Sequence, residues 1–302
     1  MPLTFRPLSL ESQAEYRQRL KQCPQISSDY SFVNLWAWRD IYALEWAWTD
    51  SLVFIRQNEP QLQYWAPVGP WHKMDWNLAF AELPFDLSLT RIPSQLAELL
   101  TDQLPERTNL SPAPDHFDYV YDVQELIELR GNRFHKKKNL LNQFKRSYEY
   151  SYIPLTTEAV EKALTLQTEW CLWRDCEDSI TLESENRAIL NTFEDWSHLE
   201  GVFGGGLLVE GNMVAYTVAE PLDDTTVVIH FEKGCPNHKG AYQAINQMFL
   251  GHSASEFTYV NREQDLGDPG LRKAKESYNP VDYLKKYSGS LGSGLEAGKR
   301  PD

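Results

Sequence analysis

The feature that most constrains this chain is a series of strand patterns between residues 204 and 280, separated by tight turns. Apolar runs at 207–209 and 213–219 flank a Glu210-Gly211-Asn212 turn, which predicts an antiparallel hairpin. A second turn at 222–224 leads to a third strand at 226–231, so we expect a three-stranded meander. The elements expected next are helix 241–250, strand 257–260, helix 270–277 and a closing strand, 281–287.

The chain of 302 residues exceeds what one core usually fills, so two domains are expected. The first 110 residues have the pattern of an α+β unit, in which an aromatic-rich helix at 29–42 is expected to leave Asp29 solvated or capping. The other elements expected there are a hairpin of strands 52–55 and 62–65 and helices 76–83 and 94–103. The elements expected between the two patterns are strand 117–123 and helices 123–129, 160–173 and 185–196. The Pro-rich segment 110–114 is typical of a linker, so we expect domains at 1–114 and 115–288 and a disordered tail at 289–302.

Composition excludes some classes of protein. The formal net charge of -14 argues against a general nucleic-acid coat protein, because phosphate affinity comes from clustered Lys and Arg. No apolar run approaches the roughly 18 to 20 residues of a membrane span, so a cytoplasmic location is expected. Four cysteines, Cys23, Cys171, Cys176 and Cys235, are too sparse for a disulfide framework or a zinc site, and we expect reduced thiols and no metal.

One segment departs from this acidic balance. Residues 130–146 carry seven Lys or Arg and no acid. Phe134, Leu141 and Phe144 recur at helical spacing and can bury one face. The basic side chains on the rest of the helix include Arg133, Lys136, Lys137 and Lys138. Two interpretations stay open: a solvated basic helix, or a phosphate-binding surface for tRNA, an anionic lipid head group or a nucleotide.

The order helix, helix, three antiparallel strands, helix, strand, helix, strand is that of the Gcn5-related acyl-CoA N-acyltransferase fold. In that fold the loop before the helix after the meander presents backbone amides to an anion. Here the loop contains Lys239, Gly240 and Ala241, which we expect to bind substrate. Tyr242 occupies a position where the usual acetyl-CoA loop has Gly or Ala, which disfavours acetyl-CoA as the ligand.

Longer strings carry a more particular resemblance. They are His230-Phe231-Glu232-Lys233, Lys239 to Asn246, Asn261 to Gly267 and Gly270 to Pro280. With the basic segment and the helix at 29–42, these strings resemble a bacterial family grouped with the C-terminal domain of phosphatidylglycerol lysyltransferases, over residues 25–287.

The resemblance implies tandem acyltransferase folds of class α+β, each a mixed, mainly antiparallel sheet flanked by helices. It also implies kinship with enzymes that move an aminoacyl group from aminoacyl-tRNA to a lipid or peptidoglycan acceptor. Asp265, before Leu266-Gly267, and Lys275, before Tyr278-Asn279-Pro280, match the acidic and basic positions of those enzymes. Their large membrane-embedded half has no counterpart in these 302 residues.

Transfer of an aminoacyl ester needs a group that takes the acceptor's proton and donors for the developing oxyanion. The candidates for the base are Glu232, Glu263 and Asp265. The candidates for binding phosphate or carboxylate are Arg262, Arg272 and Lys275. The alternative for each carboxylate is a structural ion pair with those same cations, and His230 is expected to be a packed core residue.

We therefore expect an acyl or aminoacyl transferase with aminoacyl-tRNA or acyl-CoA as donor and a lipid, peptide or small molecule as acceptor. The alternatives are a non-catalytic module that binds an anionic metabolite or lipid, and a CoA-dependent N-acetyltransferase.

Overall fold

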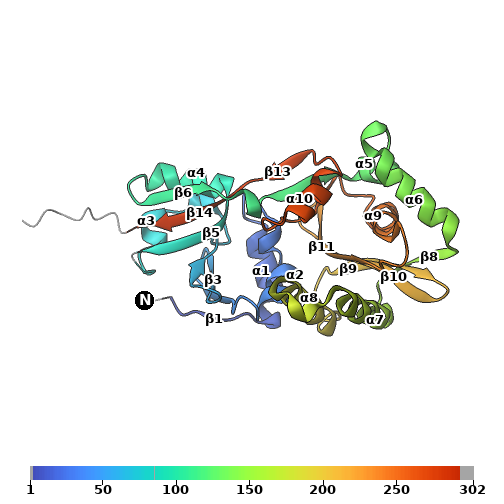
Figure 1. Cartoon of the computed structure of the whole chain (residues 1–302). Helices are drawn as coiled ribbons and strands as arrows, with labels where there is room; N and C mark the ends of the chain where they lie inside the picture. Colours follow the sequence, from blue (N-terminus) through green and yellow to red (C-terminus); the bar gives the residue numbers. More distant parts are fainter. Residues whose placement is uncertain (1–2, 85, 293–302) are drawn as a thin grey trace, which may run out of the picture. The chain divides into compact units, whose positions relative to one another are not determined.

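Two seven-stranded sheets organise the chain, one in each of two compact units (Figure 1). The computed structural model describes residues 3–84 and 86–292. Unit 1 contains the described residues of 1–32, 39–117 and 284–292, and unit 2 contains residues 33–38 and 118–283. Both sheets are mixed and mainly antiparallel and both units contain helices, which confirms the predicted α+β class.

The sheet of unit 1 has the strand order β1-β2-β3-β4-β5-β14-β6. Its strands are β1 Arg6–Pro7, β2 Glu45–Trp48, β3 Val53–Gln57, β4 Gln63–Tyr64, β5 Leu87–Pro93, β6 Thr108–Pro112 and β14 Lys286–Leu291. The helices of this half of the chain are α1 Gln13–Leu20, α2 Phe32–Trp38, α3 Trp76–Ala79 and α4 Ser94–Gln103, and residues 33–38 of α2 belong to unit 2. The predicted hairpin is confirmed, because β3 pairs with β4 antiparallel.

Three predictions about the chain's connections were wrong. The expected linker at 110–114 begins within β6, an edge strand whose Pro112 needs no outward backbone donor. The expected closing strand is two strands, β13 (Asp282–Leu284) in the sheet of unit 2 and β14 in the sheet of unit 1. Residues 289–291 of the expected tail belong to β14, where a Cβ on Gly289 would lie 2.0 Å from the Asn109 carbonyl oxygen of β6. Residues 293–302 of that tail lie outside the described residues.

A buried ion cluster lies inside unit 1. The Asp29 side chain is 0% exposed and accepts hydrogen bonds from Arg91 on β5, at 2.7 Å, and from Lys286 on β14. The predicted solvated or capping role of Asp29 is therefore wrong, because its carboxylate is buried and paired with two cations. The pairing was not predicted because both cations come from strands distant in sequence. Burial alone would raise the pKa of Asp29, but the Lys286 and Arg91 charges outweigh it and hold the pKa well below its ordinary value.

Removing this carboxylate should strongly destabilise unit 1. We expect Asp29→Asn to lower the free energy of unfolding by about 3 to 5 kcal/mol, because it leaves two buried cations uncompensated. Denaturant titration measures the change, and Asp102→Asn, on an exposed position of α4, serves as the control. Equal stability of the two variants would contradict the cluster's importance.

The sheet of unit 2 has the strand order β13-β7-β12-β11-β10-β9-β8. Its further strands are β7 Asp118–Asp122, β8 Tyr150–Pro154, β9 Phe203–Val209, β10 Asn212–Pro221, β11 Thr226–Gly234 and β12 Tyr259–Asn261. Its helices are α5 Val123–Glu128, α6 His135–Ser147, α7 Thr157–Arg174, α8 Ile180–Glu194, α9 Ala241–Ser253 and α10 Pro269–Glu276. The predicted meander is confirmed as β9, β10 and β11, with α9 packed on one face alongside α5 and α6, and α7 on the other (Figure 1).

Strands β11 and β12 part after a short parallel contact. Only Thr226, Val227 and Val228 pair with β12, although β11 continues to Gly234. The chain that follows β12 stays with β7 instead: Arg262 N–H donates to the Tyr119 carbonyl, and Tyr119 N–H donates to the Glu263 carbonyl. The backbone pairing of β11 with this chain therefore ends before residues 229–234, and we call the region between the two diverging strands the wedge.

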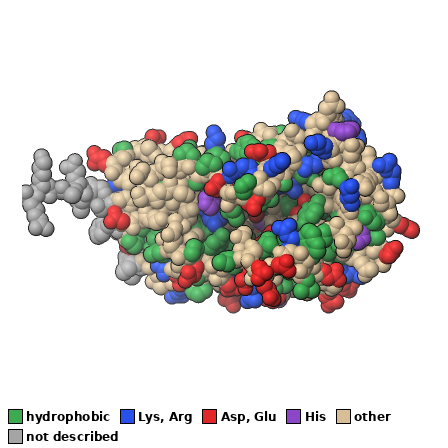
Figure 2. Space-filling model, viewed as in Figure 1, with side chains coloured by type: hydrophobic (Ala, Val, Ile, Leu, Met, Phe, Trp, Pro, Cys, Tyr) green, Lys and Arg blue, Asp and Glu red, His purple; other side chains and the backbone are tan. Residues whose placement is uncertain are grey.

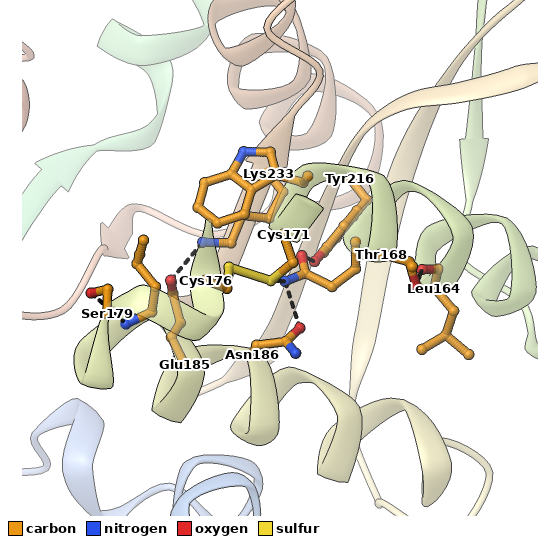
Figure 3. Close-up of a disulfide and its surroundings, with 12 residues drawn as sticks. Leu164, Thr168, Cys171, Cys176, Ser179, Glu185, Asn186, Tyr216 and Lys233 are labelled. Atoms are coloured by element: carbon orange, nitrogen blue, oxygen red, sulfur yellow. Dashed lines mark hydrogen bonds and ion pairs between the residues drawn. A yellow bond between two sulfur atoms is a disulfide. The ribbon is translucent and has the colours of Figure 1, made fainter. Parts of the chain in front are cut away.

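The prediction of reduced thiols was wrong for one pair of cysteines. Cys171, near the end of α7, forms a disulfide with Cys176 in the turn before α8 (Figure 3). Their Cα atoms lie 5.0 Å apart because α7 ends at Asp175 in a left-handed conformation and the chain reverses. Cys23 and Cys235 are free thiols.

Thiol labelling should distinguish the two pairs. In denaturant without reductant, we expect an alkylating reagent to modify Cys23 and Cys235 only, and after reduction all four cysteines. Peptide mass spectrometry locates the labels. Labelling of Cys171 and Cys176 without reductant would contradict the disulfide.

Within the described residues, no helix is both long and apolar enough to cross a membrane. Over the same ranges, no group of three His, Cys, Asp or Glu side chains is arranged to hold a metal ion.

Candidate functional site

Side chains, rather than backbone hydrogen bonds, join the two edges of the wedge. Glu232 on β11 accepts a hydrogen bond of 3.0 Å from Arg262 Nη2, and His230 on β11 lies 2.8 Å from a Glu263 oxygen. A β-bulge at His230 interrupts the alternation of β11, because Val218 pairs with Phe231 whereas Ala219 pairs with Ile229. The divergence of the strands thus brings together the predicted residues Glu232, Arg262 and Glu263.

The Arg262 guanidinium is fixed by its neighbours, but one of its nitrogens, Nη1, donates to no protein group within the described residues. Its guanidinium carbon lies 4.8 Å from the centre of the Tyr278 ring and 5.8 Å from that of Tyr121. The side chain is 15% exposed, and within the described residues its buried Nη1 has no hydrogen-bond partner. Burial alone would lower the pKa of Arg262, but the Glu232 carboxylate outweighs it and raises that pKa, so the guanidinium stays charged. A buried donor of this kind can donate to a water or to a ligand oxygen.

Lys137 brings the basic helix to the same place. Its Nζ lies 3.8 Å from the centre of the Tyr278 ring. Burial, with a further contribution from the Arg262 charge, lowers the pKa of Lys137 to about 8. Lys137 on α6 and Arg262 after β12 therefore present two nitrogen groups around one tyrosine ring.

The other basic residues of α6 and its approach remain at the surface. Lys136 and Lys138 are exposed, and Arg133 forms an ion pair with Glu125 on α5. Figure 2 shows Lys and Arg side chains gathered over α5 and α6, whereas Asp and Glu side chains gather over α8. Lys137 thus lies at the candidate site, whereas Arg133, Lys136 and Lys138 lie at the surface.

His230 lies between two carboxylates. Its Nδ1 is 2.8 Å from Glu263 and its Nε2 is 3.1 Å from Glu220 at the end of β10, with the imidazole 1% exposed. Burial alone would lower its pKa, but the hydrogen bonds to Glu220 and Glu263 raise the pKa of His230 to about 9. Burial raises the pKa of Glu263. His230 is packed, as expected, and it is also an ion-pair centre.

Sequence reasoning missed Glu220, although the hairpin offered a signal. Glu220 and His230 flank the 222–224 turn, and the register pairs Glu220 with Val228. Counting residues outward from such a turn predicts which side chains become neighbours on adjacent strands. It also missed Asn246 of α9, whose amide donates to Glu232 at 3.2 Å.

Lys275 of α10 holds the turn that follows β12. Its Nζ donates to the carbonyl oxygens of Arg262 and, at 3.2 Å, of Glu263. Burial, followed by the Arg262 charge, lowers the pKa of Lys275 to about 8. Glu263 adopts a left-handed conformation, with φ of 57°, and the two hydrogen bonds from Lys275 stabilise that turn.

Asp265 and Arg272 form a second bonded cluster. The Asp265 carboxylate is 0% exposed and accepts two hydrogen bonds of 2.8 Å from Arg272, one of 2.6 Å from Tyr119 and one of 2.8 Å from Gly267 N–H. Burial alone would raise its pKa, but these hydrogen bonds outweigh it and lower the pKa of Asp265. The geometry gives Asp265 a positioning role in the turn before α10.

The predicted anion loop is closely covered by α6. Gly240 has φ of 89°, and a Cβ at this position would lie 2.2 Å from the Leu140 carbonyl oxygen of α6. The Ala241 N–H already donates to the His238 carbonyl at 3.0 Å. Lys239 is exposed. The loop therefore packs closely against α6 where α9 begins. Of the two backbone amides expected to bind an anion, those of Gly240 and Ala241, the amide of Ala241 is already hydrogen-bonded.

The ion-pair centre should make the stability of unit 2 depend on pH. The folded pKa of His230, about 9, lies above its unfolded value of about 6.5. Its contribution is therefore complete below about pH 6.5 and is lost as pH rises through about 9. We expect the stability advantage of the wild type over His230→Gln, measured by denaturant titration, to shrink across that window. His198→Gln, at a largely exposed histidine, should show no such trend, and a pH-independent difference for His230→Gln would contradict this assignment.

Comparison with known proteins shows the fold and the family. A conserved protein of unknown function from Bacteroides thetaiotaomicron is 31% identical, with a TM-score of 0.88 over 96% of this chain and 99% of that one. The structure of L-PGS from Bacillus licheniformis has a TM-score of 0.64 at 12% identity, covering 94% of this chain and 93% of that one, and so shares the tandem acyltransferase fold.

An uncharacterized protein of Mycoplasmoides gallisepticum is 27% identical over 177 residues, which are 56% of this chain and 54% of that protein. The chain therefore matches about half the length of this curated relative. The family model described as "Phosphatidylglycerol lysyltransferase, C-terminal" matches residues 20–288. By this match over most of its length, the chain belongs to the phosphatidylglycerol lysyltransferase C-terminal family.

Proposed function

We propose that this chain transfers an aminoacyl group from an aminoacyl ester, with aminoacyl-tRNA as the donor, and that the reaction takes place in the wedge between β11 and β12. The observation that carries the proposal is the buried, unpartnered Nη1 of Arg262, beside Lys137 and Glu232. Family membership supports the reaction class, because the family is named for a lysyltransferase.

Arg262 is suited to stabilise the charge that develops during transfer. When an acceptor amine or hydroxyl attacks the ester carbonyl, the carbonyl oxygen becomes negative and needs a fixed donor. Arg262 Nη1 is such a donor, since Glu232 holds Nη2 and the rings of Tyr278 and Tyr121 flank the guanidinium. Glu232 acts here as a positioning residue, itself oriented by Asn246.

Lys137 is suited to accept the acceptor's proton. A general base works best when its pKa lies near the working pH, and the pKa of Lys137 is about 8. In the balanced reaction a new C–N or C–O bond forms and the ester C–O bond of the donor breaks. The acceptor's proton passes to Lys137 and then to the departing ribose oxygen, so no cofactor or oxidant is consumed.

An acyl-CoA donor is less well supported. The Gly240 helix start is pressed against the Leu140 carbonyl, whose partial negative charge disfavours an anion there. Tyr242 occupies the position where the usual acetyl-CoA loop has Gly or Ala. The Tyr242 hydroxyl accepts a hydrogen bond of 3.1 Å from Trp170 Nε1. These contacts favour an ester donor over acetyl-CoA.

A non-catalytic binding module is the second candidate. The observation in its favour is that all three nominated bases are engaged, Glu232 by Arg262, Glu263 by His230 and Asp265 by Arg272. Such a module would bind an anion through Arg262 and Lys137 without turnover. A cytoplasmic location is the prediction that accompanies a tRNA donor, and the acceptor remains a lipid, peptide or small molecule.

Transfer assays with matched lysine variants separate these candidates. With aminoacyl-tRNA and a panel of amine and lipid acceptors, we expect Lys137→Met to lower kcat by about 10² to 10⁴, because a general base is removed. Lys138→Met, at the adjacent exposed position, should keep the wild-type rate. The wild-type kcat/KM should rise with pH through about 8, and this rise should be absent in Lys137→Met.

Two outcomes would count against the proposal. One is the absence of transfer from any charged tRNA to any acceptor. The other is an equal loss of rate in Lys137→Met and Lys138→Met, which would indicate a general charge effect. Retained anion binding with no turnover would favour the binding module.

A further inference from the structure

We propose a second ligand site in unit 2, for a nucleoside phosphate, in the cavity between α6, β8 and α9. The cavity has a volume of about 480 Å³. The lining residues that the argument uses are Lys145 of α6, Tyr150 and Tyr152 of β8, and Gln247 and His252 of α9. None of them belongs to the candidate site, and the proposal does not depend on transferase activity.

The cavity contains an aromatic stack that is built in advance. The rings of Tyr152 and His252 lie 4.7 Å apart at an interplanar angle of 16°. The Tyr152 hydroxyl is 2.7 Å from Ser253 Oγ, and it passes so close to β9 that a Cβ on Gly205 would lie 2.1 Å from it. Packing and hydrogen bonding therefore fix the tyrosine ring before any ligand arrives.

His252 offers the other face of this stack to a ligand. The residue is exposed, while one face of its imidazole lies against Tyr152. A nucleobase can extend such a stack because every base has a flat π surface, and base stacking on aromatic side chains is a common mode of recognition. Tyr150 widens the aromatic wall.

Lys145 supplies the charge that a phosphate needs. Its Nζ lies 3.3 Å from the Gln247 side-chain oxygen, and Gln247 is oriented by donating to the Ile127 carbonyl at 3.1 Å. Within the described part of the chain Lys145 has only this neutral partner, in a protein of net charge -14. Burial lowers the pKa of Lys145, and no carboxylate of the described residues is paired with it to compete with the negative charge of a phosphate.

The same ligand chemistry has two sources, a free nucleotide and a nucleotide of an RNA strand. Lys145 follows Lys137 by eight residues on α6, which places them about 12 Å apart along the helix. An RNA strand lying along α6 could place a base in the cavity while its end reaches Lys137. That second source, unlike the first, rests on the proposed function.

Binding measurements on the full chain test the site. Calorimetry with adenosine 5′-monophosphate, adenosine and ribose 5-phosphate separates base from phosphate. We expect adenosine 5′-monophosphate to bind about 10-fold or more tightly than either fragment, because only it uses both the stack and Lys145. Lys145→Gln should weaken the monophosphate but not adenosine, and His252→Ala should weaken both. Lys162→Gln, an exposed lysine of α7, is the charge-matched control.

An uncharged RNA oligonucleotide distinguishes the sources. If both variants weaken the RNA and the monophosphate, an RNA strand is the source; if only the monophosphate is affected, the source is a free nucleotide. Three results would overturn the proposed site. They are no saturable binding of the RNA or the monophosphate, equal affinity for ribose 5-phosphate and the monophosphate, and affinities of Lys145→Gln and His252→Ala equal to that of Lys162→Gln. These measurements need no turnover, so a failed transfer assay with intact binding rejects the proposed function alone.

Discussion

The parting of β11 and β12 is the constraint on which the rest of unit 2 depends. Three residue pairs join the strands, and the chain then follows β7, which leaves six of the nine residues of β11 without a backbone partner on that side. Side chains must close this gap, and Glu232 with Arg262 and His230 with Glu263 do so. The same divergence that weakens the sheet thus creates a lined, partly buried wedge whose groups are fixed before a ligand binds, which is the condition for electrostatic catalysis.

Most of the charged residues near Arg262 are bonded to other protein groups, so few of them can contact a ligand. Asp265 orders the turn before α10, Lys275 supports the carbonyls at 262 and 263, and His230 is enclosed by two carboxylates. Each contact fixes the backbone from which Arg262 projects. The groups that the proposed function assigns to the ligand are the buried Nη1 of Arg262 and the nearby nitrogen of Lys137. In that proposal the other residues of the network, including Glu232, position these two groups.

Much of this arrangement could be predicted from the sequence, and the failures have physical causes. The meander, the helices around it and the meeting of Glu232, Arg262 and Glu263 follow from strand periodicity and short turns. The prolines at 112 and 114 and the glycines near 289 led to the predictions of a linker and a tail. These predictions failed because local composition cannot reveal that β6 and β14 pair across more than 170 residues. Asp29 was misjudged for the same reason, because its partners come from distant strands. Glu220 was missed although its partner, His230, lies on the adjacent strand of the same hairpin. The disulfide depends on a left-handed residue at 175 that no spacing rule predicts.

The central claim is that Arg262 Nη1 donates a hydrogen bond to an oxygen atom of the bound ligand. A crystal structure with a stable amide analogue of an aminoacyl adenosine tests it most directly. The account predicts the analogue's carbonyl oxygen at about 2.7 to 3.2 Å from Arg262 Nη1, with the Lys137 nitrogen beside the acceptor position. An analogue bound elsewhere on the protein, with Arg262 Nη1 bonded to an ordered water or a shifted side chain, would contradict it.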